Sequence, residues 1–439
     1  MNGHSVAHAI RSRNAHAVRL VERPAAAPQL DPFALAERAH ARKEPFFLWQ
    51  SADRSRTLLG VGEVLRLTSQ GSGRFGEIDA AWRALDCSEA TDALLLGGFA
   101  FFDAAQPGSR RAADFFVPQV LVDREGTIAR TLLFTRKEGA GQAEYSDAQR
   151  LLDALREGVP SRVVPLQVFD PPGARRAFKA RVLAATEEIA RGDLEKVVLA
   201  RTRFVRYPEF PSIAAVLRTL SAREADCRVF AYGDGRSVFL GATPELLCLC
   251  QDGTARVDCL AGSAPRGADP ASDAAIGLSL LGSQKNLHEH RCVVDAVRGA
   301  LEGLGLSASA PPAPRLRRLA NVQHLYTPVR AQLDGQGILP LAQALHPTPA
   351  VGGSPREPAL RWIAAHEGGA RGLFAGAVGF VDARGDGELD VGLRSALLRP
   401  HGARLYAGCG IVRGSDPDEE FKESEVKMRP MMNALRGGR

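Results

Sequence analysis

Cysteine is scarce in this sequence, and its spacing excludes several kinds of site. The 439 residues include seven cysteines, none of them in a C-x-x-C pair. Cys248 and Cys250, in "LCLC", sit too close along the chain for a bridge or a zinc site. A disulfide framework and a structural zinc site are therefore excluded, and we expect reduced thiols in a cytoplasmic protein.

Long hydrophobic runs are also missing. No apolar stretch approaches the roughly 18 residues that suggest a membrane helix. Runs such as "DALLLGGFAFF" are interrupted by glycine and are typical of buried strands. The first 30 residues are rich in Ala, Arg and His and lack the apolar centre of a secretory signal. We expect no membrane partner and a disordered leader over residues 1–30, with a transit peptide as the alternative.

Aromatic residues form only 6% of the chain and do not alternate with its basic residues. Proteins that bind single-stranded nucleic acid need such aromatic platforms for stacking. Lys plus Arg exceed Asp plus Glu by 56 − 50 = 6, and the basic residues are dispersed. The positive charge suits a small anionic ligand. We expect no nucleic-acid partner, a small-molecule substrate, and a monomer or weak dimer.

The pattern of apolar runs and turns predicts an α+β fold. Turn sequences at "DGRS" (234–237), "QDGT" (251–254) and "ARGDGE" (383–388) favour antiparallel hairpins over parallel crossovers. Helices are predicted over residues 175–192, 283–304 and 354–367, and at the C-terminus. We predict one domain over residues 31–436, in which large antiparallel sheets are sandwiched with helices and the catalytic motifs lie in residues 165–435.

The last predicted helix carries a polar face. Glu420, Glu423 and Lys427 stand at i, i+3 and i+7 in "EFKESEVK", so they share one side of a helix. A solvated Glu423–Lys427 ion pair is the ordinary interpretation. The preceding strand "LYAGCGIV" favours a functional one, because Gly408 and Gly410 within a strand often mark the close approach of a ligand.

A further carboxylate lies on another predicted helix, at Glu289 in "KNLHEHR". Two or three carboxylates from different helices suit Mg²⁺, which prefers oxygen ligands and keeps part of its water shell. The flanking His288 and His290 diverge by about 200 degrees on a helix and do not share a zinc ion. We therefore predict a magnesium site.

Three charged residues accompany apolar segments. Lys196 begins the strand "KVVLAR", where it is either a desolvated general base or a strand-end lysine that reaches solvent. Glu245 follows a Thr-Pro turn and is either a strand-edge charge or a buried carboxyl that can donate a proton. Arg394 interrupts "VGLRSALL", and a buried arginine needs an anionic partner, either internal or on a substrate.

Together and in this order, these segments resemble the chorismate-utilising enzymes. That family includes isochorismate synthases, salicylate synthases and the large subunits of anthranilate and aminodeoxychorismate synthases. The resemblance is strong over residues 165–435 and loose before them, and it implies the fold of anthranilate synthase component I. The motifs that carry it are "KVVLAR" (196–201), "FLGATPELL" (239–247), "CLAGSAPRG" (259–267), "KNLHEHR" (285–291), "QHLYTPV" (323–329), "LHPTPAVGGSPRE" (345–357), "GLFAGAVGFVDARGDGELDVGLRSA" (372–396) and "YAGCGIVRGSDPDEEFKESEVK" (406–427).

The resemblance also implies a role for each matching residue. Lys196 would deprotonate the water that attacks C2 of chorismate, and Glu245 would protonate the departing C4 hydroxyl. Glu289 and Glu423 would bind Mg²⁺, with Glu420 as an accessory acid. The positions that would contact the substrate are Gly262, Ser263, His324, Thr348, Arg394, Gly408, Cys409, Gly410 and Lys427.

Two stretches indicate which reaction is expected. Ala261 in "CLAGS" stands where aminodeoxychorismate synthases resemble "PIKGT", whose lysine attacks C2 itself. "HPTP" (346–349) is similar to isochorismate synthases and unlike the ammonia-using and salicylate-forming members. We expect an isomerase, an Mg²⁺-dependent isochorismate synthase, with salicylate synthase as the alternative. Asn286, Phe374 and Thr243 depart from commoner family residues.

Overall fold

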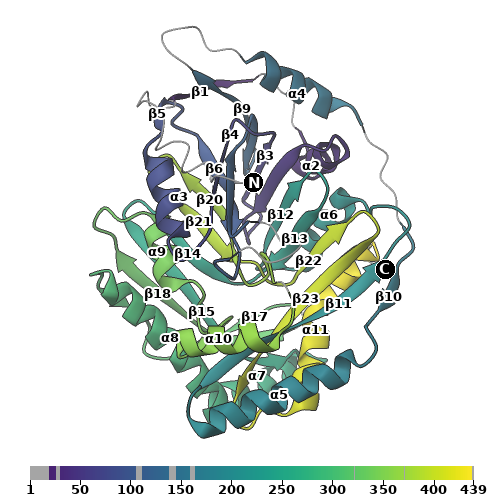
Figure 1. Cartoon of the computed structure of the whole chain (residues 1–439), viewed down its shortest axis with the longest axis vertical. Coiled ribbons are helices and arrows are strands. Elements are labelled where there is room, and N and C mark those ends of the chain that lie inside the picture. Colours follow the sequence, from purple (N-terminus) through teal and green to yellow (C-terminus); the bar gives the residue numbers. More distant parts are fainter. Residues whose placement is uncertain are drawn as a thin grey trace.

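Two large β-sheets organise the chain (Figure 1). The computed structural model describes residues 19–25, 30–104, 111–137, 145–158, 164–320, 322–369 and 371–437. The larger sheet has thirteen strands in the order β10-β11-β23-β22-β13-β12-β2-β3-β8-β9-β1-β5, with β19 beside β11. Its strands are β1 (Arg19–Pro24), β2 (Pro45–Gln50), β3 (Arg56–Val61), β5 (Asp86–Glu89), β8 (Val120–Glu125), β9 (Ile128–Lys137), β10 (Gln167–Phe169), β11 (Lys196–Arg206), β12 (Arg228–Asp234), β13 (Val238–Thr243), β19 (Gly353–Ser354), β22 (Ser395–Arg399) and β23 (Gly402–Val412).

The smaller sheet has ten strands in the order β16-β18-β15-β14-β21-β20-β6-β7-β4, with β17 beside β18. Its strands are β4 (Leu65–Ser69), β6 (Leu94–Phe99), β7 (Ala113–Val117), β14 (Leu246–Gln251), β15 (Thr254–Pro265), β16 (Ala308–Ser309), β17 (Arg315–Arg318), β18 (Val322–Gln332), β20 (Ala377–Asp382) and β21 (Gly387–Val391). The helices are α2 (Pro32–Ala41), α3 (Arg74–Arg83), α4 (Ser146–Arg156), α5 (Ala174–Arg191), α6 (Ile213–Arg223), α7 (Pro270–Gly282), α8 (Gln284–Gly303), α9 (Ile338–Leu345), α10 (Arg356–His366) and α11 (Pro417–Leu435).

The predicted α+β class is confirmed. Strand pairs are antiparallel in both sheets except for β1 and β5, which are parallel. The turn sequences join β12 to β13, β14 to β15 and β20 to β21, as predicted. Both sheets also combine strands from before and after residue 165, because β2 pairs with β12 and β6 with β20.

Local signals explain where several helices begin and end. Helix α5 stops at Gly192, whose φ of 97° is the left-handed conformation that glycine adopts easily at a helix C-terminus. The sequence patterns above missed α7, although its start is well marked. Asp269 caps the first turn in a capping box with Ser272, and Pro270 occupies the first helical position.

The predicted disordered leader is wrong over residues 19–24. These residues form β1, which pairs with β9 from Arg19↔Lys137 to Pro24↔Leu132. Leu20 and Val21 are buried, and burial of these two apolar side chains favours an ordered strand over a solvated tail. Residues 1–18 and 26–29, the rest of the predicted leader apart from Ala25 and Leu30, lie outside the described residues.

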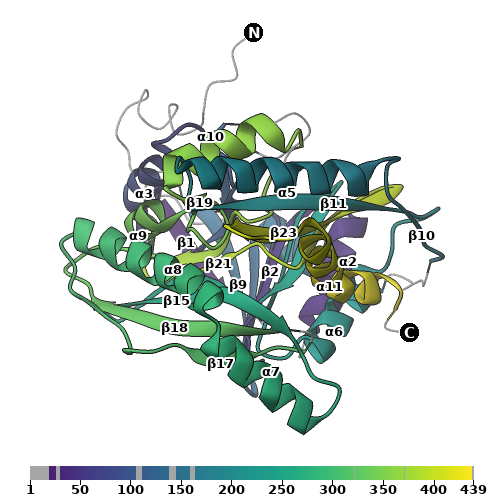
Figure 2. The ribbon, with the colours of Figure 1, turned by 90° about the horizontal axis from the view of Figure 1, so that it is seen from below.

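The two sheets pack against each other through a buried core. The rings of Trp49 on β2 and Phe380 on β20 meet edge to face with centroids 5.2 Å apart. The Trp49 indole Nε1–H also donates to Asp390 Oδ2 on β21 at 2.8 Å. Helices α5 and α10 lie along β11, α8 covers β15 and β18, and α11 packs against β23 (Figure 2). Among the described helices, none is both long and apolar enough to cross a membrane.

A buried ion pair, Arg371–Glu367, bonds to backbone groups of β11 beyond the short strand β19. Strand β19 pairs only with Lys196 and Val197. Beyond them, Arg371 donates to the Val198 carbonyl at 2.7 Å, and Glu367 accepts from the Ala200 N–H at 2.6 Å. Arg371 and Glu367 also bond to each other, with Nε to Oε2 at 2.7 Å. The two side chains thus take the place of a neighbouring strand at this edge.

We expect Glu367→Ala to lower the free energy of unfolding by about 3–5 kcal/mol, because it removes the buried carboxylate that pairs with the buried Arg371 guanidinium. Urea unfolding followed by circular dichroism measures this loss. The matched control is Glu188→Ala on α5, which breaks the exposed Arg191–Glu188 pair and should change stability by less than about 1 kcal/mol. Equal losses in the two variants would contradict the prediction.

Candidate active site

A polar cavity of about 250 Å³ lies where the start of β11, the start of α8, β15, β23 and α11 converge. It brings together residues that are far apart in the sequence. Twelve of the fourteen predicted site residues line it: Lys196, Glu245, Gly262, Ser263, Glu289, His324, Arg394, Gly408, Gly410, Glu420, Glu423 and Lys427.

Lys196 stands at the first position of β11 and is buried, with 2% of its surface exposed. Its Nζ forms an ion pair with Glu289 Oε1 on α8 at 2.7 Å. Strand β23 runs beside it, and a Cβ at Gly410 would lie 2.9 Å from both Lys196 Cε and Glu289 Oε1. Glycine at position 410 therefore leaves the space in which the lysine and the carboxylate meet.

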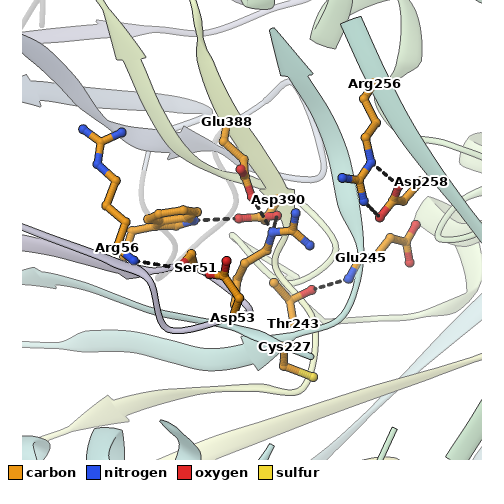
Figure 3. A network of polar contacts seen from close by, with 12 residues as sticks. Ser51, Asp53, Arg56, Cys227, Thr243, Glu245, Arg256, Asp258, Glu388 and Asp390 are labelled. Atoms are coloured by element: carbon orange, nitrogen blue, oxygen red, sulfur yellow. Dashed lines mark hydrogen bonds and ion pairs between the residues drawn. The ribbon is translucent and has the colours of Figure 1, made fainter. Parts of the chain in front are cut away.

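Glu245 follows Pro244 in the turn between β13 and β14, and its side chain is 6% exposed. Burial raises the pKa of this carboxyl to about 8, although the positive charges of Lys196 and Arg394 oppose the shift. Its backbone N–H donates to Thr243 Oγ1 at 3.3 Å (Figure 3). The carboxyl is therefore protonated at neutral pH and can donate a proton into the cavity.

Arg394 lies between β21 and β22, where the sequence pattern suggested the interior of a strand. Its φ of 48° is in the left-handed region, which is strained for a residue with a Cβ. No hydrogen bond or ion pair of its side chain to another described residue is present, although Glu423 and Glu224 contribute a favourable field. Burial lowers the pKa of the guanidinium. A cation with this environment is suited to bind a carboxylate ligand.

The second half of β23 presents a free backbone edge to the cavity. Strand β22 pairs with residues 402–405 of β23 only, so the described residues 406–412 have a strand neighbour on one side alone, β11. Lys427 Nζ on α11 donates to the Gly408 carbonyl at 2.9 Å and forms an ion pair with Glu423 Oε1 at 2.5 Å. The polar face predicted for this helix is therefore present, and it points into the cavity.

Two carboxylates on α11 crowd each other beside this edge. Burial, together with the negative charge of Glu423, raises the pKa of Glu420 to about 7. Oxygen atoms of Glu420 and Glu423 and the sulfur of Cys409 all lie within 4.8 Å of one another. Crowded carboxylate oxygens fit a hard divalent cation such as Mg²⁺, and Glu289 supplies a third carboxylate in the same cavity.

Ser263 and His324 form a polar wall on the smaller sheet. They face each other on β15 and β18, and Ser263 Oγ lies 2.9 Å from His324 Nδ1. A register shift at Gly262, whose φ is 74°, turns this part of β15 toward the cavity. Burial, with the charges of Arg394 and Lys427, holds the pKa of His324 well below its usual range. The imidazole is therefore neutral.

Two predicted substrate contacts do not line the cavity. Cys409 lies between Gly408 and Gly410, and alternate residues of a strand face opposite sides. Its Sγ donates to the Glu420 carbonyl at 3.1 Å, against α11. Thr348 is buried and is not among the residues that line the cavity, although Ala350 and Val351 are. The contact predicted at Cys409 is through its backbone, between Gly408 and Gly410, so it stays a prediction, as does the contact at Thr348.

The sequence patterns missed further lining residues, among them Lys285, Arg371 and Tyr406. Lys285 stands four residues before Glu289 on α8, so helical spacing could have found it. Arg371 lies in a loop, and Tyr406 stacks on Phe374 with ring centroids 5.1 Å apart. Neither of these two carries a local signal in the sequence, because both are placed by long-range packing.

Comparisons with known proteins agree with this geometry. A family model described as "Chorismate binding enzyme" matches residues 5–436. The chain is 38% identical over 423 residues to the salicylate biosynthesis isochorismate synthase of Pseudomonas aeruginosa, covering 92% of this chain and 88% of that protein. It is 33% identical over 426 residues to the isochorismate synthase MenF of Bacillus subtilis, covering 90% and 88%. The solved structure of MenF, the menaquinone-specific isochorismate synthase from Escherichia coli, has a TM-score of 0.81 at 28% identity, covering 98% of this chain and 99% of that chain.

Proposed function

This chain belongs to the family of chorismate binding enzymes, and from that premise we propose that it is an isochorismate synthase. The reaction adds water at C2 of chorismate, shifts the double bonds and releases the C4 hydroxyl as water, so it is an isomerisation without a redox step. One observation carries the proposal. Lys196 at the start of β11 and Glu245, a carboxyl that is protonated at neutral pH, open into the same cavity beside the cation of Arg394.

In the proposed mechanism, Lys196 takes the proton of the water that adds at C2, and Glu245 gives its proton to the leaving C4 hydroxyl. The lysine must be neutral for this step, whereas in the structure it is held by Glu289. Engagement of the Glu289 carboxylate elsewhere in the cavity would leave the amine free. Glu245 needs no such rearrangement, because burial already keeps its proton in place.

The substrate carries two carboxylates, and the cavity offers groups for both. We assign one to Arg394, whose guanidinium forms no direct ion pair with a described residue, although Glu423 and Glu224 contribute a favourable field. The other lies near the β23 edge at Gly408 and Gly410, where Lys427 is anchored. Glu289, Glu420 and Glu423 would hold Mg²⁺, which when bound neutralises negative charge on the substrate.

The proposal is tested by incubating the purified protein with chorismate and Mg²⁺ and separating the products by chromatography. Isochorismate as the main product is the expected result. No consumption of chorismate would reject the proposal. Salicylate and pyruvate as the main products would instead identify a salicylate synthase.

Turnover should fall as the pH rises through about 8. The pKa of Glu245 is raised to about 8 by burial, so the carboxyl is protonated below this pH and is lost as a proton donor above it. A profile of kcat from about pH 6 to about pH 10 measures the decline. A rate that stays level through this range would contradict the assignment of Glu245 as the acid.

Removal of divalent cations should abolish turnover, and added Mg²⁺ should restore it. Glu423→Gln removes one carboxylate charge from the proposed site, so the Mg²⁺ concentration for half-maximal rate should rise by at least about 10-fold. The control is Glu302→Gln, at an exposed position on α8 away from the cavity. An unchanged Mg²⁺ requirement in Glu423→Gln would show that the ion binds elsewhere.

A further inference from the structure

The chain passes between the two sheets twice at one place beside the cavity. Strand β13 of the larger sheet continues into β14 of the smaller one through residues 243–246, and β21 of the smaller sheet continues into β22 of the larger one through residues 391–395. The first crossing carries Glu245 and the second carries Arg394. The distance between these two groups therefore depends on how the crossings are joined.

The backbone ladder between the crossings is interrupted. Ala242 N–H donates to the Arg394 carbonyl at 3.4 Å, and Val391 N–H donates to the Glu245 carbonyl at 3.0 Å. Between these two bonds stands Pro244, which has no N–H to donate. A regular ladder would also have the Glu245 N–H donate to the Val391 carbonyl. Here that carbonyl accepts the Leu393 N–H at 2.7 Å instead, so no direct bond returns from Glu245 to Val391.

The side chain of Thr243 bridges these two groups. Its hydroxyl donates to the Val391 carbonyl at 2.6 Å. The same hydroxyl accepts the Glu245 N–H at 3.3 Å (Figure 3). Thr243 is fully buried, so water does not replace either bond. One hydroxyl thus joins the backbone of Glu245 to the end of β21.

From this geometry we infer that Thr243 is a positioning residue for the proton donor. Its hydroxyl fixes the turn that carries Glu245 against the crossing that carries Arg394, and so holds the acid at the distance that the reaction needs. The inference rests on the proposed function only for the role of Glu245 as the proton donor. The contact of Thr243 with two backbone groups of this chain does not depend on the reaction.

The test uses Thr243→Val, which keeps the shape of the side chain and removes the hydroxyl, and Thr243→Ser, which keeps the hydroxyl. We expect Thr243→Val to lower kcat by about 100-fold, as a displacement of a catalytic group by about 1 Å does, with KM within about twofold. Thr243→Ser should restore most of kcat. The control is Thr131→Val on β9, a buried threonine away from the cavity, which should leave kcat unchanged.

A double-mutant cycle separates positioning from general damage. If Thr243 acts through Glu245, then Thr243→Val should have little further effect in a Glu245→Gln background. An equal loss of kcat in both backgrounds would overturn the inference, as would a Thr243→Val enzyme with kcat within about twofold of the parent.

Hydrogen exchange gives a readout that does not depend on turnover. The amide of Glu245 should exchange at least about 10-fold faster in Thr243→Val than in the parent, and at the parental rate in Thr243→Ser and Thr131→Val. Unchanged protection of this amide would overturn the inference even if the enzyme is active. Faster exchange in a protein that does not consume chorismate would support the positioning contact and reject the proposed function alone.

Discussion

Lys196→Ala should reduce isochorismate formation by roughly 10²–10⁴-fold, the usual contribution of a general acid or base. The variant removes the amine that faces the cavity from the start of β11 and leaves Glu289 without its partner at 2.7 Å. Chorismate consumption measures the rate, and circular dichroism verifies that the chain is folded. Lys422→Ala, at an exposed lysine on α11 paired with Glu419, is the matched control and should retain the parental rate.

A second substitution separates charge from basicity at this position. Lys196→Arg keeps a positive charge beside Glu289, but a guanidinium is not deprotonated in proteins. The arginine variant should therefore fold and be as inactive as the alanine variant. Substantial turnover by Lys196→Arg would mean that the positive charge, not proton transfer, is what this position supplies.

Glu245→Gln should cause a loss of similar size, roughly 10²–10⁴-fold in kcat, because glutamine keeps the shape of the side chain and has no acidic proton. Chorismate should still bind, since the groups proposed to hold its carboxylates are unchanged. Equilibrium binding of chorismate, compared with steady-state rates, distinguishes lost chemistry from lost affinity.

The control for this variant is Glu44→Gln. Burial also raises the pKa of Glu44, but the residue lies between α2 and β2, away from the cavity. It should keep the parental rate. A Glu245→Gln enzyme that turns over at a near-parental rate would remove Glu245 from the mechanism and leave the cavity without its proton donor.

Much of the fold follows from local patterns. The hairpin turns at residues 234–237, 251–254 and 383–388 join antiparallel strands because glycine supplies the backbone conformation that tight turns need. Gly192 ends α5 for the same reason. Strand β1 was missed because its six residues gain stability by pairing with distant strands, β5 and β9, the second of them more than 100 residues later in the chain.

The acids and bases of the site could also be predicted from the sequence, because the resemblance identified residues that line the cavity. These are Lys196, Glu245, Glu289 and Glu423. The resemblance did not distinguish the side chain of Cys409 from its neighbouring glycines, because the direction of a side chain depends on which face of β23 meets α11. Nor did it reveal that Thr243 ties two sheet crossings together.

The sequence by itself determined three long helices and the C-terminal one, the hairpins and the identity of the acids and bases, because these depend on neighbouring residues and on side-chain chemistry. Only the tertiary structure decided the ion pairing and the protonation of these side chains. The ion pair of Lys196 joins residues 93 positions apart, and the proton on Glu245 is retained because distant segments bury its carboxyl. Burial and Coulomb interactions act through space, so their effect at the site appears only once β11, α8, β23 and α11 have come together.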